Sequence, residues 1–121
     1  MSESLYERLG GTEGITKIAS VAVDLHFVNK GIATRFENSK MSIDQLKNGA
    51  ATFFIAGTGG PSVYEGKDML AAHKGMNTSD TEFVEVISDI MQSLDKNNIG
   101  QREKEEVLFV LFGMRKDIVA V

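Results

Sequence analysis

The chain of 121 residues contains no cysteine, a single proline and only two histidines. The absence of cysteine excludes disulfides, thiolate zinc sites, iron–sulfur clusters and cysteine nucleophiles. Basic side chains are in the minority, because 13 lysines and arginines stand against 17 aspartates and glutamates and the formal net charge is -4. These bases are dispersed among acids, so the sequence lacks a basic footprint for phosphate backbones. We therefore expect no nucleic-acid partner.

Long apolar runs and leader patterns are also missing. No window approaches the roughly 18 uninterrupted apolar residues that a membrane-spanning helix needs. The N-terminus has no basic segment followed by an apolar run, as a secretory signal does. We therefore expect a cytoplasmic protein without a membrane partner. Because domains run to roughly 100–200 residues, residues 1–121 are predicted to form a single domain.

Apolar residues recur at steps of three and four in the first third of the chain, which is typical of amphipathic helices. A short helical turn over residues 5–9 is expected to stop at the following glycine pair, after which Thr12 suits the N-cap of a longer helix. The inward stripe of that helix includes His26. Residues 29–31 end it, and residues 32–36 form a short connecting element.

The later helices have clearer starts. Ser42 and Ser79 each stand three residues before a glutamine or glutamate, which predicts two capping boxes. The first of these helices is expected to end within residues 57–61, and a short helix over residues 67–73 follows. The apolar stripe of the helix that begins at Ser42, expected to face a core, is Ile43, Leu46, Ala50, Phe53 and Phe54. The stripe predicted for one last helix is Val107, Val110, Leu111, Met114 and Ile118. Since strict two-residue alternation is absent, the chain is predicted to be all-α.

Residues 57–76 hold five of the twelve glycines, the one proline and His73. A phosphate-binding loop would need a preceding strand and a Gly-Lys-Ser/Thr ending, and both are absent. The glycines are better explained as a helix stop. Neither a strand-to-helix serine elbow nor a second histidine at helical spacing supports a hydrolase or a zinc site.

Both histidines lie on inward-facing helical faces among large apolar residues. A lone histidine in such a place is usually a hydrogen-bonded core residue. Two of them, in a chain that has only two, make a shared interior ligand a second explanation. Haem suits such an arrangement, because it occupies an apolar slot between helices and takes one imidazole nitrogen on its iron.

Several short segments at fixed spacings carry a family resemblance. They are residues 5–11, Phe36, the Phe53–Phe54 pair, Gly59-Gly60-Pro61 with Tyr64, Gly66, Met69 and His73, then Phe83 and residues 115–119. Together they resemble a truncated haemoglobin of group I, and the resemblance spans nearly the whole chain. It implies an all-α, truncated globin-like fold, a two-over-two helical sandwich around haem.

The resemblance also implies a cofactor site for haem b. His73 is then the proximal iron ligand, and Gly59 and Gly60 let the chain turn toward the haem. The remaining residues that it places around the porphyrin are Phe36, Leu46, Ala50, Phe53, Tyr64, Met69, Phe83 and Val86. No haem-propionate partner stands out, and each of the four bases near these segments, Arg35, Lys40, Lys47 and Lys67, is expected to be a solvated surface charge.

The sequence departs from the family on the distal side. Val23 stands where many members have a tyrosine, and Leu46, Gly49 and Ala50 stand where glutamine or histidine is common. His26, one turn from Val23, is the substitute. Three roles stay open for it: a hydrogen-bond donor to bound dioxygen, a second iron ligand, or a core histidine bonded to a backbone carbonyl.

The implied function is the binding of dioxygen and other diatomic gases such as nitric oxide and carbon monoxide, for transport or storage. Nitric oxide dioxygenation is an extension that needs an external reductase, so enzymatic activity is left undecided. Two alternatives remain: a bis-histidyl haem protein for electron transfer or sensing, and a helical interaction module in which the histidines are structural.

Overall fold

The computed structural model describes residues 3–64, 66 and 69–121. In this part of the chain the regular elements are helices, and one isolated β-bridge pairs Thr78 with Val119. The helices are α1 (Leu5–Arg8), α2 (Gly11–Val28), α3 (Ala33–Glu37), α4 (Ile43–Gly57), α5 (Met69–His73), α6 (Asp80–Lys96), α7 (Gln101–Phe112) and α8 (Arg115–Ile118). The predicted all-α class is confirmed.

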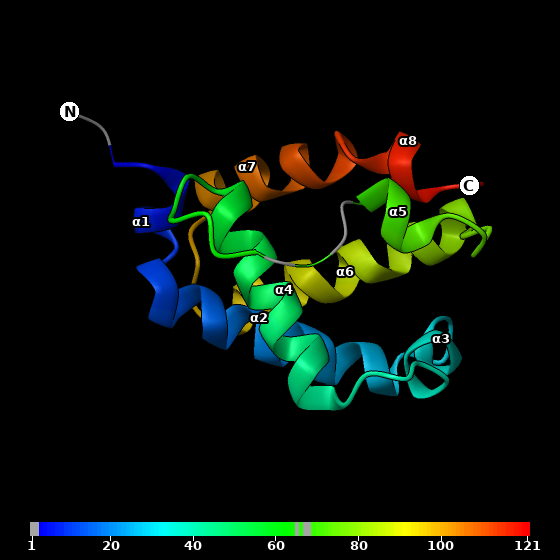
Figure 1. Cartoon of the computed structure of the whole chain (residues 1–121). Helices are drawn as coiled ribbons and strands as arrows, with labels where there is room; N and C mark the ends of the chain where they lie inside the picture. Colours follow the sequence, from blue (N-terminus) through cyan, green and yellow to red (C-terminus); the bar gives the residue numbers. More distant parts are fainter. Residues whose placement is uncertain (1–2, 65, 67–68) are drawn as a thin grey trace.

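The four long helices form two packed pairs. Helix α2 packs against α4, and α6 packs against α7 while also contacting α2. Figure 1 shows α4 crossing in front of α2, with the short helices α3, α5 and α8 gathered at one end of the molecule. The helices described are too short or too polar to cross a membrane.

Among the helix starts that the structure describes, three have a capping box. Those at Ser42 and Ser79 were predicted and are confirmed, and a third at Ser4 starts α1. The predicted N-cap at Thr12 is wrong, because the cap of α2 is Gly10, whose φ of 98° is left-handed and costs glycine little. The Thr12 hydroxyl instead lies 2.7 Å from the hydroxyl of Tyr6 and ties α1 to α2.

The chain between α4 and α5 turns at the glycines that the sequence singles out. Helix α4 ends at Gly57, within the predicted interval. Gly59 has a φ of 98°, and a Cβ on Gly60 would lie only 2.4 Å from the ring of Tyr6. Helix α5 is described from Met69, so the predicted start at residues 67 and 68 lies outside the described residues.

The last predicted helix is two helices in the structure. Helix α7 ends at Phe112 and α8 begins at Arg115. The predicted stripe still faces inward in part, since Val107 and Leu111 are buried while Met114 and Ile118 pack against the core from its edge. Val110, the remaining member of the stripe, is half-buried and is not part of the core cluster.

The packed core lies between α2, α6 and α7. Its most buried large side chains include Ile15 and Leu94, each 1% exposed. The stripe predicted for α4 is a core face only in part: Phe54 packs against the core, but Ile43 is 42% exposed, and the residues of α4 that are buried in the core are Ala51 and Ile55. The rest of that stripe faces a cavity.

Removing a core side chain from α6 tests this packing. Leu94→Ala should lower the free energy of unfolding by about 2–5 kcal/mol, because it leaves a void in a close-packed region. Val84→Ala on the same helix, where Val84 is 50% exposed, is the matched control and should change it by less than about 0.5 kcal/mol. Urea unfolding followed by circular dichroism measures both. Equal effects in the two variants would contradict the assignment of the core.

Candidate functional site

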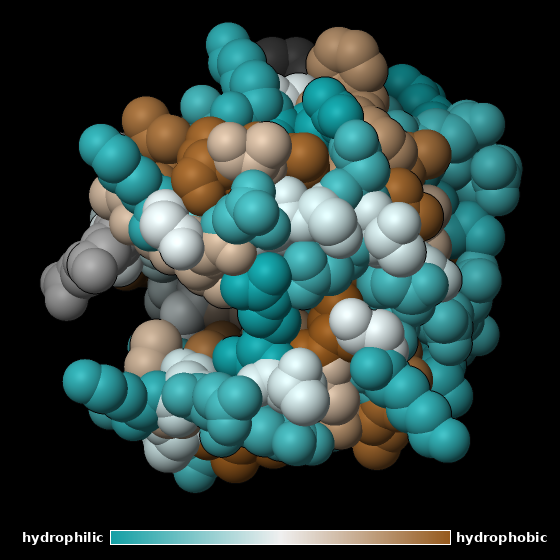
Figure 2. All heavy atoms as spheres, turned by 90° about the vertical axis from the view of Figure 1, so that its right-hand side faces the viewer, coloured by the Kyte–Doolittle hydropathy of each residue, from teal (hydrophilic) through white to brown (hydrophobic). Residues whose placement is uncertain are grey.

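A cavity of about 330 Å³ lies between α4 and α6 and reaches α3 and α5. Its wall contains every residue that the sequence placed around haem: His26, Phe36, Leu46, Ala50, Phe53, Tyr64, Met69, His73, Phe83 and Val86. The face in Figure 2 is hollowed between an upper and a lower lobe, and hydrophobic residues are visible inside the hollow. The structure thus brings these residues together around one space, although they come from distant parts of the chain.

The wall is mainly apolar. Helix α4 contributes Leu46, Ala50 and Phe53, and α6 contributes Phe83 and Val86. The ring of Phe53 meets the ring of Tyr64 edge to face, with centroids 5.3 Å apart. An apolar wall of this kind excludes water from a ligand and strengthens the few polar contacts made inside it.

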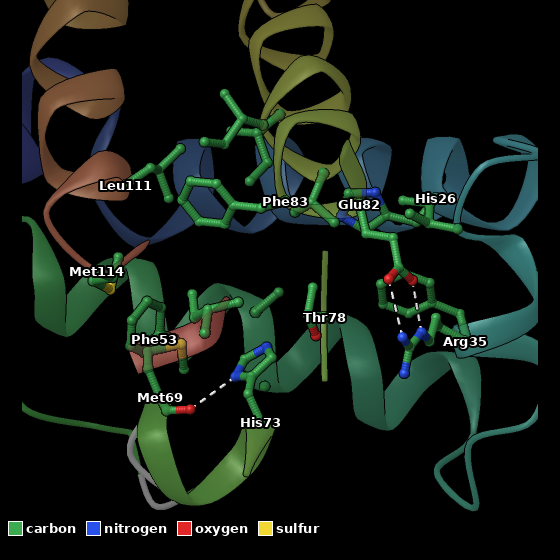
Figure 3. Close-up of a pocket in the computed structure, with 18 of the residues that line it drawn as sticks. His26, Arg35, Phe53, Met69, His73, Thr78, Glu82, Phe83, Leu111 and Met114 are labelled. Carbon is green, nitrogen blue, oxygen red and sulfur yellow. Dashed lines mark hydrogen bonds and ion pairs between the residues drawn. The ribbon is translucent and has the colours of Figure 1, made fainter. Parts of the chain in front are cut away.

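His73 is held at the end of α5 by its own helix. Its Nδ1 lies 2.8 Å from the carbonyl oxygen of Met69. A carbonyl can only accept, so in the neutral imidazole Nδ1 carries the proton and Nε2 carries a lone pair. Figure 3 shows the ring pointing from α5 into the space between Phe53, Phe83 and Thr78. This geometry leaves Nε2 as the nitrogen able to bind a metal.

His26 also lines the cavity, but its partner was not foreseen. The side chain is 6% exposed, stacks on Phe36 with ring centroids 4.9 Å apart, and places Nδ1 2.8 Å from Oδ2 of Asp89 on α6. One of the three roles left open for His26 gave it a backbone carbonyl as partner, and the structure places a buried carboxylate there instead. Burial lowers the pKa of His26 and outweighs the opposing hydrogen bond and charge of Asp89, so the neutral imidazole is favoured.

Asp89 belongs to a polar stripe on α6 that sequence analysis passed over. Glu82, Glu85, Asp89 and Ser93 follow one another at steps of three, four and four, beside the apolar stripe of the same helix. Their partners are Arg35, Asn29, His26 and the main-chain carbonyl of Ile18. The helical spacing was the available signal, and it was overlooked because acids at such spacing usually face solvent.

Arg35 and Glu82 form an ion pair at the wall of the cavity. The Nε–Oε2 and Nη2–Oε1 distances are 2.7 and 3.0 Å, and Nη1 donates to the carbonyl of Met76 at 2.9 Å. Figure 3 shows this two-pronged contact between α3 and α6. The expectation that Arg35 is a solvated surface charge is therefore wrong. Hydrogen bonding by Arg35, helped by the N–H of Ser79, lowers the pKa of Glu82 to about 2.

The other three basic residues considered as haem-propionate partners either do not line the cavity or lie outside the described residues. Lys47 pairs with Asp24 at 2.9 Å, Lys40 is not among the described residues that line the cavity, and Lys67 lies outside the described residues. Val23, at the position where the family often has a tyrosine, is 3% exposed and is likewise absent from the described wall.

Thr78 has a buried hydroxyl group without a hydrogen-bond partner among the described residues. It is 8% exposed and lines the cavity in the loop after α5. Its hydroxyl oxygen is the one buried side-chain polar atom without a hydrogen-bond partner among the described residues. In Figure 3 this oxygen points toward the side of the cavity that holds His73. A buried hydroxyl without a partner is costly, so this one is available to an ordered water or to a group bound in the cavity.

Helices packed in two pairs around an apolar cavity, with a histidine aimed into it, define a truncated-globin type of haem-binding fold. Solved structures agree. The truncated haemoglobin of Tetrahymena pyriformis in its Fe(III) form superposes with a TM-score of 0.92 at 25% identity, covering 98% of this chain and 100% of that one. A 2/2 haemoglobin of a Synechococcus species shares the fold with a TM-score of 0.87 at 22% identity, covering 97% and 98%.

Sequence comparison identifies the family. The chain belongs to the bacterial-like globins, whose profile matches residues 4–120. It is similar to the group 1 truncated haemoglobin of Tetrahymena pyriformis, 26% identical over 97% of this chain and 95% of the relative. It is also 27% identical to the one of Tetrahymena thermophila over 94% and 93%. The predicted resemblance is confirmed, and with it the general expectation of this family, haem-based gas binding.

The ion pair at the cavity makes a prediction about acid stability. Because the pKa of Glu82 falls from 4.5 to about 2 on folding, its carboxylate stabilises the fold fully above pH 4.5, and this contribution is lost as the pH falls toward 2. We expect Glu82→Gln to flatten the decline of the unfolding free energy over this interval, since glutamine keeps the Ser79 cap but not the charge. Urea titrations at a series of pH values measure it.

The control for this experiment is Glu13→Gln, because the Glu13 side chain is 86% exposed, does not line the cavity, and pairs with the exposed Lys17 at 3.6 Å. That variant should keep the wild-type slope. If Glu82→Gln kept it too, the ion pair would not be formed in solution.

Proposed function

We propose that this chain binds haem b in the cavity through Nε2 of His73 and takes dioxygen or another diatomic gas there. The observation that carries the proposal is the geometry of His73. Its Nδ1 is fixed by the Met69 carbonyl at 2.8 Å, which directs the lone pair of Nε2 into an apolar cavity. The family membership reported above supports the same cofactor.

The residues present fit this cofactor. A porphyrin needs flat apolar walls, and the cavity offers the rings of Phe36, Phe53 and Phe83. Its two carboxylates need polar partners at one edge, and the unpaired hydroxyl of Thr78 is a donor with no other use among the described residues. Arg35 is a second cavity-wall donor, although it is already paired with Glu82.

When bound, the haem iron supplies an open coordination position for a small gas. The chain does the rest. Leu46 and Ala50 on α4 would give the bound gas an apolar surrounding, and His73 would hold the cofactor through Nε2. Gly49 and Ala50 are the small residues among those of α4 that line the cavity. They leave room for a two-atom ligand, which supports gas binding over chemistry on a larger substrate.

One observation favours a second candidate, a bis-histidyl haem protein for electron transfer or for redox or gas sensing. His26 lines the same cavity as His73, and its Nδ1 is already used by Asp89. The nitrogen left over is Nε2, as in His73.

Nitric oxide dioxygenation at the same site would require an electron donor, and nitric oxide consumption with a reductase present measures it.

The first prediction concerns the proposed iron ligand. Haem added to the wild-type protein should give a Soret band and a ferrous spectrum with a histidine-bound iron. His73→Gly should lose the iron–histidine stretching band in resonance Raman spectra, and added imidazole should restore it by filling the vacated space. A histidine signature that survives in His73→Gly without imidazole would show that the assignment is wrong.

The second prediction concerns the unpaired hydroxyl. Thr78→Val keeps the shape of the side chain and removes the donor, so the loaded protein should release haem about 3- to 10-fold faster, the equivalent of one hydrogen bond. Transfer to excess apomyoglobin measures the rate. Thr16→Val is the matched control, because the Thr16 hydroxyl bonds to its own helix at Thr12. Unchanged release in Thr78→Val would remove Thr78 from the site.

A further inference from the structure

The His26–Asp89 pair is a buried polar contact that the proposed haem site does not require. The Nδ1–Oδ2 distance is 2.8 Å, and the two residues are 6% and 4% exposed. They come from α2 and α6, 63 positions apart. A pair so fully buried has its hydrogen bonds set by its neighbours rather than by water.

The neighbours of Asp89 fix where the shared proton lies. Nδ2 of Asn29 lies 3.2 Å from Oδ1 and 3.1 Å from Oδ2 of Asp89, and it also donates to Glu85 at 2.9 Å. An amide nitrogen only donates, so both oxygens of Asp89 are used as acceptors. A carboxylate carries no proton of its own, so the remaining contact, with Nδ1 of His26, is a donation from the ring. The neutral imidazole therefore carries its proton on Nδ1.

The other ring nitrogen of His26 is Nε2. Among the described residues, Nε2 of His26 has no hydrogen-bond partner. It is nevertheless not a fully buried unpaired atom, because in the described chain only the hydroxyl of Thr78 has that status. His26 is one of the residues that line the cavity. With Nδ1 used by Asp89, the nitrogen that His26 has left for a group in the cavity is Nε2, which carries a lone pair and no N–H group.

We propose that Asp89 is a positioning residue that holds His26 in this tautomer. The cavity then has a hydrogen-bond acceptor where the family resemblance led us to expect a donor. This arrangement lowers the preference of the loaded protein for dioxygen relative to carbon monoxide. The inference rests on the proposed haem site. Dioxygen takes up partial negative charge on binding and gains from a donor, whereas carbon monoxide takes up little. A lone pair offers no such gain. A ring nitrogen with a free lone pair is also the form in which a histidine ligates a metal.

Asp89→Asn should reverse the arrangement. The new carboxamide keeps its oxygen toward Asn29 and turns its NH₂ group toward His26, so the imidazole moves its proton to Nε2. We expect oxygen dissociation from the loaded protein to slow about tenfold, the effect of one buried hydrogen bond to a charged acceptor. The carbon monoxide rate should change by less than about twofold. Stopped-flow and flash photolysis measure the two rates.

The tautomer itself is a readout independent of gas affinity. Nitrogen-15 shifts of the His26 ring, recorded on the diamagnetic carbon monoxide form, should show a protonated Nδ1 in the wild type and a protonated Nε2 in Asp89→Asn. Glu85→Gln is the matched control, because Glu85 shares Asn29 with Asp89 but has no contact with His26 in the described contacts. It should keep the wild-type tautomer and rates.

Two results would overturn the proposal: a wild-type His26 protonated on Nε2, or a His26→Leu variant that releases oxygen about tenfold faster than the wild type, as loss of a donor would produce. Both are measured without Asp89→Asn and so stand even where that variant fails to fold. Failure of the proposed function is distinguishable, since a wild-type protein that takes up no haem lacks a Soret band, whereas the tautomer remains measurable in the haem-free chain.

Discussion

The arrangement of the cavity depends on the polar stripe of α6 and its partners on α2 and α3. Ser93 is fully buried and donates to the carbonyl of Ile18 at 2.6 Å, and Asp89 is buried against His26. Shifting α6 along α2 by one turn would leave a buried carboxylate and a buried hydroxyl unpaired, at a cost of several kcal/mol. The register between the two helices is therefore fixed by hydrogen bonds as well as by packing. That register places Phe83 and Val86 across the cavity from α4.

His73 depends on a different set of contacts, because α5 is too short to hold a position alone. The loop that follows it is pinned by the end of the chain. The N–H of Ala120 donates to the carbonyl of Thr78, and the N–H of Asn77 donates to Val121, both at 2.9 Å. Helix α8 packs against α5 in the same region. The two histidines of the cavity are thus placed by separate parts of the fold, one by the α2–α6 contact and the other by the C-terminal segment.

Local chemistry explains which features could be predicted from the sequence. Capping boxes at Ser42 and Ser79 involve residues three apart, so the sequence contains all the information needed. The cap at Thr12 was predicted wrongly because glycine can adopt a left-handed φ and because the hydroxyl bonds to Tyr6 on another helix. The stripe on α4 shows a related limit, since periodicity reveals an apolar face but not whether a packed core or a cavity covers it. The helical spacing of Asp89 was visible in the sequence, but its partner lies 63 residues away, so the sequence did not show that this acid is buried and paired rather than facing solvent.

The two histidines share one electronic feature that only the structure reveals. In each ring Nδ1 is used, by the carbonyl of Met69 for His73 and by the carboxylate of Asp89 for His26. Each therefore offers Nε2 as a lone pair to the same apolar cavity. A carboxylate raises the basicity of its imidazole more than a neutral carbonyl does, because it stabilises positive charge on the ring. His26 thus combines the stronger partner with the deeper burial, and the role in gas selection that we propose for it rests on that pairing rather than on the absence of a distal tyrosine alone.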